Sequence, residues 1–278
     1  MTSAAYRTIE KPLRVGFICP TWRASLTAGY TEAALQTFFE TTPEGVAIVV
    51  DDGSPDWVES KMQERLQKIA PTEQSIHFYH FSNEYGLTRS WNKGLDIADS
   101  LGLEYVIAGN NDVLFPPNWH FGLTHALANG FTMVGPLSNA PGITAKGKQE
   151  VGRYVQDYKV TDDPAYLEEV AFNLMTFNMG KVIESPVNGF FQMCRLEGWR
   201  SNMIDLGETK TYYNPLNTHT SKGHKNLTPT MTLNEDEWQG RARGAGLRSG
   251  IVLSSFIFHY RAVSRGDKYK RGQWYRKK

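Results

Sequence analysis

The segment that decides the fold is Val46-Ala47-Ile48-Val49-Val50-Asp51-Asp52-Gly53-Ser54-Pro55 (VAIVVDDGSP, residues 46–55). Its first five residues form a continuous apolar run rich in β-branched side chains, which is typical of a strand buried on both faces of a parallel sheet. The run stops at Asp51 and Asp52, and the following Gly53 to Pro55 is a turn signal. Two carboxylates are therefore expected at the carboxyl end of a central strand, where open α/β sheets bind their ligands.

Strands and helices are predicted to alternate around this segment. Apolar runs predict further strands at Leu13–Cys19, Ser75–Phe81 and Glu104–Ala108. Helical spacing of apolar residues predicts helices at Tyr30–Phe39, Asp56–Ile69 and Thr88–Ser100. This alternation predicts the α/β class, with a doubly wound, mostly parallel central sheet flanked by helices.

The pattern becomes less regular after Gly135. The residues predict a loop at Ser138–Gly142, helices at Pro164–Phe177 and Asp236–Ala245, strands at Phe190–Cys194 and Ile251–Tyr260, and a polar, mobile loop at Asn214–Pro229. No internal repeat and no low-complexity tract interrupts the chain. We expect a single domain.

Composition excludes several classes of protein. The chain has 278 residues, of which 40% are hydrophobic and 21% charged, as in an ordinary globular protein. No apolar run approaches the ~18–20 residues of a membrane helix, and residues 1–11 lack the apolar stretch of a signal peptide. Cys19 and Cys194 both lie in apolar runs, which indicates buried, reduced thiols. We therefore expect a cytoplasmic protein without a transmembrane segment.

A second polar segment, Asn110-Asn111-Asp112, follows the strand predicted at Glu104–Ala108. It presents one carboxylate beside two amides. Mg²⁺ and Mn²⁺ prefer oxygen ligands, and Mg²⁺ is commonly held by one or two carboxylates together with substrate phosphates. An ordinary Asn/Asp turn would have the same composition, so the segment alone leaves both interpretations open.

A third acidic segment comprises Glu235, Asp236 and Glu237. Adjacent carboxylates raise one another's pKa, which suits a general base. The alternative is the acidic first turn of a helix, which the helix dipole favours. His259 ends an apolar strand, where a histidine is either structural or a metal ligand.

In their order along the chain, these motifs resemble the family-2 glycosyltransferases, which have the GT-A, Rossmann-like nucleotide-diphospho-sugar transferase fold. The matching segments are Cys19–Arg23 (CPTWR), Val49–Ser54 (VVDDGS), Gly86 with Asn92–Gly94, Asn110–Asp112 in place of the D-x-D metal motif, Asn188–Phe191, Glu235–Asp236 of the E-D element, and His259–Arg261 with Ser264. Each motif alone is weak, but their shared order from about residue 13 to 265 makes the resemblance specific. Asn110 stands where the family pattern has its first metal-binding carboxylate.

The resemblance implies a site for a nucleotide-sugar donor and a divalent metal ion, Mn²⁺ or Mg²⁺. The donor would be bound by residues around the strand ends: Pro20, Thr21, Arg23, Asp51, Asp52, Gly53, Asn92, Asn110, Asn111 and Asp112. The metal ligands would be Asp112 and His259. A carboxylate can accept a hydrogen bond from a ribose hydroxyl or from a uracil N–H, so a UDP-sugar is the favoured donor.

The resemblance also implies direct displacement with inversion at the anomeric carbon, without a covalent intermediate. The base that takes the proton of the acceptor hydroxyl would be one of Glu235, Asp236 and Glu237, and Asp236 is preferred. We expect four segments: an N-terminal extension (residues 1–11), a nucleotide-sugar-binding half (12–135), an acceptor-binding and catalytic half (136–260) and a basic tail (261–278).

The tail suggests the chemistry of the acceptor. Residues 261–278 contain eight Lys or Arg and one acidic residue, a charge of +7 in a chain whose net charge is +1. Such a segment favours a polyanionic partner, either nucleic acid with a modified base or a phospholipid-linked glycan. A solvated tail and a polysaccharide acceptor are the alternatives.

Two other functions remain open at this stage. A nucleotidyltransferase would use a similar sheet and metal, but residues 13–25 lack its glycine- and lysine-rich phosphate loop. A non-catalytic sugar- or nucleic-acid-binding module would keep the fold without the chemistry. The oligomeric state, the sugar and the acceptor do not follow from the sequence.

Overall fold

The computed structural model describes residues 14–142, 147–207, 209–215 and 234–261. The N-terminal extension, most of the loop predicted at Asn214–Pro229 and nearly all of the basic tail lie outside these residues. Within them, no helix is both long and apolar enough to cross a lipid bilayer. Both cysteines are buried free thiols, as predicted.

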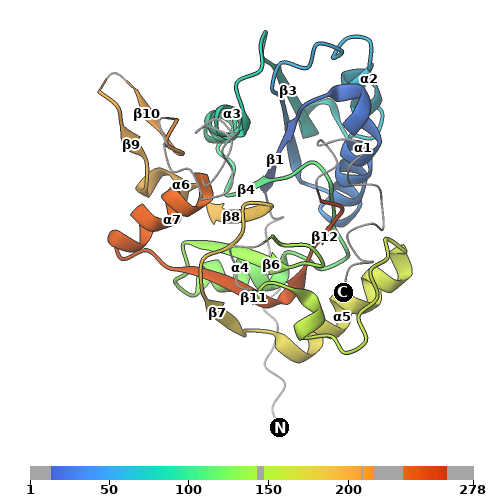
Figure 1. The fold of residues 1–278 in the computed structure, drawn as a ribbon, viewed down its shortest axis with the longest axis vertical. Helices are drawn as coiled ribbons and strands as arrows, with labels where there is room; N and C mark the ends of the chain where they lie inside the picture. The colour runs from blue at the N-terminus through green and yellow to red at the C-terminus, as the bar shows by residue number, and fades with distance from the viewer. Residues whose placement is uncertain (1–13, 143–146, 208, 216–233, 262–278) are drawn as a thin grey trace.

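A central sheet of eight strands, in the order β3-β2-β1-β4-β8-β6-β11-β7, organises the chain (Figure 1). Its strands are β1 (Val15–Thr21), β2 (Val46–Asp51), β3 (Ile76–His80), β4 (Tyr105–Gly109), β6 (Met133–Leu137), β7 (Val182–Glu184), β8 (Phe191–Arg195) and β11 (Ser249–Phe256). Strands β3, β2, β1 and β4 are mutually parallel. Strand β8 runs antiparallel between β4 and β6, β11 pairs parallel with β6, and β7 pairs antiparallel with β11. The predicted α/β class with a mostly parallel sheet is confirmed.

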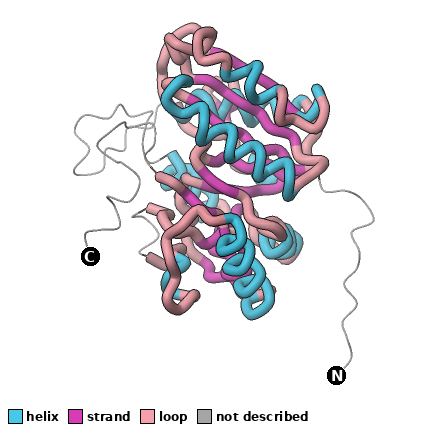
Figure 2. Tube along the Cα trace, turned by 90° about the vertical axis from the view of Figure 1, so that its right-hand side faces the viewer, coloured by secondary structure: helices cyan, strands magenta, loops and turns pink. Residues whose placement is uncertain are grey.

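Helices cover both faces of this sheet, which Figure 2 shows from the side. They are α1 (Ala24–Thr41), α2 (Met62–Gln67), α3 (Leu87–Ser100), α4 (Phe121–Ala128), α5 (Pro164–Asn178), α6 (Leu196–Ser201) and α7 (Asn234–Gly244). Successive strand residues point to opposite faces. Phe17 and Cys19 of β1 share one core with α1, whereas Ile18 packs in the other core with Trp91 of α3. Burial on both faces explains why the central strands read as continuous apolar runs.

Two short ladders lie outside the main sheet. Strand β12 (Phe258–His259) pairs antiparallel with β5 (Val113–Leu114), and β9 (Ile204–Asp205) pairs antiparallel with β10 (Lys210–Thr211). The β5–β12 ladder brings His259 beside the end of β4, although nearly 150 residues separate the two in sequence. This pairing positions the site described below.

The structure corrects two predicted elements. The helix expected at Asp56–Ile69 is helical only from Met62 to Gln67, because residues 55–61 form turns and Lys61 adopts a left-handed conformation with φ 51°. The strand expected at Ile251–Tyr260 is broken into β11 and β12 at Ile257, whose N–H instead donates to the carbonyl of Leu137. The other predicted helices and strands are present, with shifted ends.

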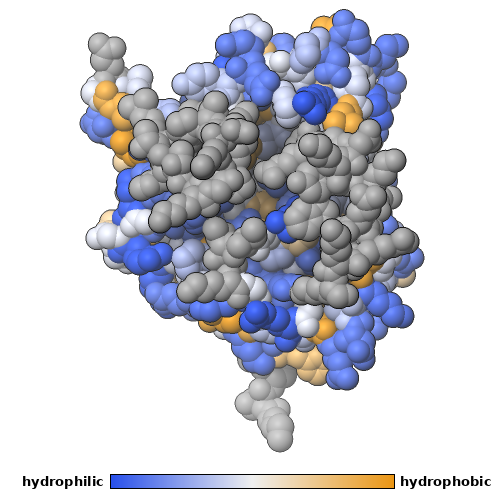
Figure 3. Space-filling view, in the orientation of Figure 1, coloured by the Kyte–Doolittle hydropathy of each residue, from blue (hydrophilic) through white to orange (hydrophobic). Residues whose placement is uncertain are grey.

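Figure 3 shows one face of the molecule, and its described part is mostly hydrophilic with small, scattered apolar patches. The large apolar side chains that are exposed come from separate elements, such as Val58 in the loop after β2, Phe172 and Phe177 on α5, and Leu206 after β9.

Candidate functional site

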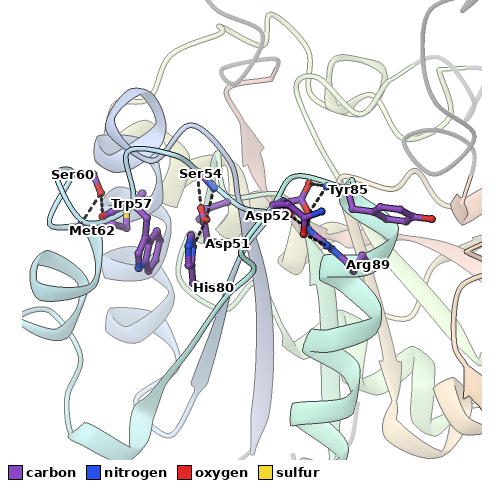
Figure 4. Close-up of polar contacts among 11 residues, drawn as sticks. Asp51, Asp52, Ser54, Trp57, Ser60, Met62, His80, Tyr85 and Arg89 are labelled. Carbon is purple, nitrogen blue, oxygen red and sulfur yellow. Dashed lines mark hydrogen bonds and ion pairs between the residues drawn. The ribbon is translucent and has the colours of Figure 1, made fainter.

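At the end of β2, Asp51 and Asp52 point in opposite directions (Figure 4). The side chain of Asp51 is fully buried. Its carboxylate accepts hydrogen bonds from the hydroxyl of Thr21 (3.0 Å) and from the backbone N–H (2.7 Å) and hydroxyl of Ser54, and it lies 2.8 Å from Nδ1 of His80. Asp51 therefore ties β1, the loop after β2 and the end of β3 together.

Asp52 turns toward α3 instead. Its carboxylate accepts the backbone N–H groups of Tyr85 (3.2 Å) and Gly86 (2.6 Å) and pairs with the guanidinium of Arg89 at 2.7 Å. The guanidinium also lies over the ring of Phe81, 3.7 Å from its centroid. Asp52 thus fixes the loop that leads from β3 into α3.

The turn after Asp52 requires glycine. Gly53 has φ 72°, and a Cβ at this position would lie 2.2 Å from the carbonyl carbon of Asn83. The two loops at this rim therefore touch through their backbones, and the predicted Gly53 is needed for that contact.

The other residues predicted from the first strand frame the same rim. Pro20 and Thr21 are in β1, in register with Val50 and Asp51 of β2. Arg23 precedes α1 in a left-handed conformation with φ 55°, and its guanidinium lies 4.2 Å from the centroid of the Trp22 ring. The predicted nucleotide-binding residues of β1 and β2 thus lie together at the carboxyl ends of the two strands.

Two predicted residues have their side-chain amides engaged elsewhere. Asn92 of α3 forms a reciprocal pair with the backbone of Tyr213, its Nδ2 donating to the carbonyl (2.9 Å) and its Oδ1 accepting the N–H (2.8 Å). Asn111 donates to the hydroxyl of Thr31 on α1 at 3.0 Å. Both amides therefore hold neighbouring elements in place.

Asp112 and His259, which the family resemblance implied as metal ligands, lie side by side beyond the end of β4. Both are buried, and Oδ1 of Asp112 lies 3.2 Å from Nε2 of His259. The N–H of Tyr260 donates to the Asp112 carbonyl (2.9 Å), which continues the β5–β12 ladder across the pair. The amide of Asn110 also lies 3.2 Å from Nε2.

The orientation of the His259 ring is set by its other nitrogen. Nδ1 lies 2.8 Å from the carbonyl oxygen of Ala140, which can only accept, so Nδ1 carries a proton. In the neutral ring Nε2 then presents its lone pair toward Asp112. A lone pair 3.2 Å from a carboxylate oxygen is a favourable arrangement when a cation is shared between them.

The donor set fits a divalent ion. One carboxylate and one imidazole gather here, and adjacent ligands of an octahedral ion with bonds of ~2.1 Å lie about 3 Å apart. Among the residues that the structure describes, no group of three or more His, Cys, Asp and Glu side chains is arranged to hold a metal. An ion held by these two residues would take its remaining ligands from water or from a bound substrate, the arrangement that Mg²⁺ favours.

The acidic segment opens α7, and its three carboxylates have different surroundings. Glu237 pairs with Arg241 at 2.6 Å, and Arg241 also donates to the carbonyl of Tyr212, so this pair is structural. The pKa of Glu235 is raised to about 7, chiefly by burial; the neighbouring Asp236 adds to the rise, and backbone hydrogen bonds from the N–H groups of Glu235 itself and Gly189 oppose it. Burial also raises the pKa of Asp236.

The turn before β8 links Glu235 to Asp112 and His259. A Cβ on Gly189 would lie 2.8 Å from Cδ of Glu235, so the carboxylate lies directly against this glycine. The next residue, Phe190, stacks on the ring of His259 with centroids 5.1 Å apart, and its carbonyl accepts the N–H of Asn110 (2.9 Å). The end of β4, the start of β8 and α7 therefore meet at one rim of the sheet.

Sequence reasoning missed three residues that build this rim. Asn139 bonds to the backbone of His259, Ala140 orients its ring, and Gln239 of α7 bonds to the N–H and carbonyl of Val187, just before β8. The only signal was the polar loop predicted at Ser138–Gly142, because a side-chain bond to backbone about 120 residues away leaves no local pattern.

The mostly parallel sheet, with carboxylates at the carboxyl ends of its strands, has the GT-A fold of the glycosyltransferases. The likeness to two solved structures supports this class. Within that class, the chain belongs to the family described as "Glycosyl transferase family 2", whose sequence profile matches residues 23–181.

Two solved structures show the same fold. TarS of S. aureus, residues 1–349, superposes with a TM-score of 0.53 at 10% identity, covering 89% of this chain and 60% of that one. The mannosyltransferase PcManGT from Pyrobaculum calidifontis, in complex with GDP-Man and Mn²⁺, gives a TM-score of 0.55 at 14% identity, covering 90% of this chain and 57% of that one. The chain thus spans about three fifths of the length of each. No curated protein sequence matches it.

Proposed function

We propose that this chain is an inverting, metal-dependent glycosyltransferase that moves a sugar from a nucleotide diphosphate donor to an acceptor hydroxyl. One observation carries the proposal: the Asp112–His259 pair and the carboxylate of Glu235 lie at one rim, linked through Gly189 and Phe190, and Asp236 is the next residue along α7. Family membership and the GT-A fold support the same activity.

In this proposal Asp112 and His259 hold Mn²⁺ or Mg²⁺. A divalent ion bound there would neutralise charge that develops on the leaving diphosphate. The complex of PcManGT with GDP-Man and Mn²⁺ supports a divalent ion for a protein of this fold. Asp112 and His259 are buried, so their positions are fixed before the donor arrives, which lowers the cost of assembling the site.

The nucleotide would lie over the ends of β1 and β2, against Pro20, Thr21, Arg23 and the loops that Asp51 and Asp52 secure. Both carboxylates already accept several hydrogen bonds from the chain. We therefore propose that they mainly shape the pocket, and that a remaining lone pair of Asp52, rather than of the fully buried Asp51, contacts the nucleoside. Asn92, Asn110 and Asn111 would complete its wall, and uridine remains the favoured base.

Asp236 is the proposed base. Its half-buried carboxyl has a raised pKa, which makes it a better proton acceptor when ionised. Glu235 is the alternative, because it lies against Gly189 and its pKa of about 7 is matched to neutral pH. Glu237 is the least suitable of the three, since it is engaged with Arg241. Direct attack by the acceptor oxygen would invert the anomeric carbon.

The division into a nucleotide-sugar-binding half (12–135) and an acceptor-binding half (136–260) is also a proposal. The acceptor would approach from the side of α7. The basic tail would help to bind a polyanionic acceptor. Nucleic acid with a modified base, a phospholipid-linked glycan and a polysaccharide are the candidate acceptors.

The test is donor hydrolysis and transfer with the purified chain. UDP- and GDP-sugars would be screened with MnCl₂, MgCl₂ or EDTA, first for nucleotide release and then with DNA, lipid-linked glycan and polysaccharide acceptors. We expect metal-dependent release from one donor, lost in Asp112→Ala. Nucleotide binding without release or transfer would favour a non-catalytic module, and metal-independent release would remove the metal from the proposal.

A further inference from the structure

The loop after β6 holds His259, which we propose as a metal ligand, by hydrogen bonds. Nδ2 of Asn139 donates to the carbonyl of His259 (3.0 Å), and Oδ1 of Asn139 accepts the N–H of His259 (2.8 Å). One side chain thus satisfies both backbone polar groups of His259. Asn139 is itself buried, with 9% of its surface exposed, so water competes little for these bonds.

Two further contacts fix the imidazole itself. The carbonyl of Ala140 holds Nδ1 at 2.8 Å, and the ring of Phe190 stacks on the imidazole at an interplanar angle of 15°. The backbone, the direction of the ring and its plane are therefore held by three different residues. Together these contacts leave Nε2 facing the carboxylate of Asp112.

The loop that carries Asn139 is anchored in turn. The N–H of Ser138 donates to the carbonyl of Gln149 (2.9 Å), and the N–H of Val151 donates to the carbonyl of Ser138 (2.9 Å). Nε2 of Gln149 donates to the carbonyl of Pro136 at 2.7 Å. The loop that carries Asn139 is thus held by hydrogen bonds from the end of β6 onward.

The chain uses the same arrangement in other places. Asn92 pairs in the same reciprocal way with the backbone of Tyr213, at 2.9 and 2.8 Å, and Gln239 does so with Val187. Of these three side chains, only Asn139 holds a residue of the proposed metal pair.

We propose that Asn139 is a positioning residue that holds His259 ready for a divalent cation. The inference rests on the proposed function, because it takes Asp112 and His259 as the metal ligands. Residues that orient a metal ligand contribute to affinity without touching the ion, and their loss typically weakens metal binding by ~10–100-fold. Without Asn139, cation binding would also have to order the strand that carries His259, which would lower the affinity.

The test measures the affinity for MnCl₂ alone, by electron paramagnetic resonance of free Mn²⁺, in the full chain. We expect Asn139→Ala to weaken Mn²⁺ binding by about 10–100-fold. Asn202→Ala removes a bond of another buried asparagine, from its Nδ2 to the carbonyl of Trp238 at 2.9 Å, so it should lower the melting temperature and leave the Mn²⁺ affinity within about twofold. An equal loss of affinity in both variants would show a general structural effect and overturn the proposal.

A second variant covers the case in which Asn139→Ala does not fold. Asn139→Asp keeps the size of the side chain and the acceptor for the His259 N–H, but it loses the donor to the His259 carbonyl. An added carboxylate near the site would by itself strengthen cation binding. Weaker Mn²⁺ binding by Asn139→Asp would therefore identify lost positioning, and stronger binding would count against the proposal.

His259→Ala separates this inference from the proposed function. If His259→Ala loses Mn²⁺ affinity and the two Asn139 variants do not, the positioning role is wrong and the metal pair stands. If all of these variants bind Mn²⁺ as the wild type does, the metal pair itself is wrong. In parallel, ¹⁵N shifts of the His259 ring should show a proton on Nδ1 in the wild type, and a proton on Nε2 instead would overturn the arrangement.

Discussion

Two pairs of adjacent acids, Asp51-Asp52 at the end of β2 and Glu235-Asp236 at the start of α7, look alike in sequence and differ in their surroundings. The carboxylates of the first pair accept hydrogen bonds from three backbone N–H groups, two hydroxyls and a guanidinium, and one of them also contacts His80. The second pair is raised in pKa by burial, with backbone N–H groups opposing the rise at Glu235. The donors around the first pair tie its carboxylates to the neighbouring loops, whereas burial raises the pKa of the second pair and suits it to exchanging protons.

The largest expected effect tests the second pair. Asp236→Asn keeps the shape of the side chain and removes the base, so we expect kcat to fall by ~10²–10⁴-fold while donor affinity changes little. The measurement is single-turnover transfer together with nucleotide binding by calorimetry. Glu237→Gln is the matched control, because Glu237 is paired with Arg241, and it should retain most of the activity. Near wild-type turnover in Asp236→Asn would transfer the role of base to Glu235.

The next effect tests the rigidity of the first pair's loops. Gly53→Ala places a Cβ 2.2 Å from the Asn83 backbone at a φ of 72°, so we expect a loss of about 2–4 kcal/mol in the free energy of unfolding. Denaturant titration measures it. Gly29→Ala is the control, since its Cβ would meet nothing within 4 Å in helix α1. It should be neutral or slightly stabilising. Equal stability of the two variants would mean that the loops of the first pair are not in contact.

A smaller effect is the dependence of stability on pH that Glu235 of the second pair should produce. The pKa of Glu235 is raised from 4.5 to about 7 in the folded chain. The folded state therefore binds more protons than the unfolded state between these values, and the contribution of Glu235 to stability is lost as pH rises from about 4.5 to 7. Glu235→Gln should flatten this part of the profile of melting temperature against pH, and Glu237→Gln should leave it in place. A wild-type profile that is already flat would contradict the raised pKa.

The sequence allowed the sheet and the acidic motifs to be predicted because both are local. The apolar run at 46–50 indicates a strand without knowledge of its neighbours, and Asp51 marks the end of that run. The predictions that failed depend on tertiary contacts. Asp56 was expected to begin a helix, but its carboxylate accepts the N–H of Ser25 at the start of α1, which is compatible with the turns found at 55–61.

The convergence of Asp112 with His259 could be inferred only from the family resemblance, since the β5–β12 ladder joins residues nearly 150 positions apart. Nor could the sequence distinguish the two acid pairs. Their difference depends on whether donors such as Arg89 or apolar neighbours are near, and both arrive from distant segments.

The smallest expected effect refines the role of Asp52. Arg89→Lys keeps a cation but loses the planar group that lies over Phe81 while it bonds Asp52. The backbone N–H groups of Tyr85 and Gly86 remain on the Asp52 carboxylate, so we expect a loss of only about 1 kcal/mol in stability. If Asp52 shapes the nucleotide pocket through this loop, the KM for the donor should rise several-fold while kcat stays nearly constant, because uniform binding is what is lost. A fall in kcat at constant KM would instead give Arg89 a part in the transition state, and the first pair of acids could no longer be treated as a frame separate from the chemistry.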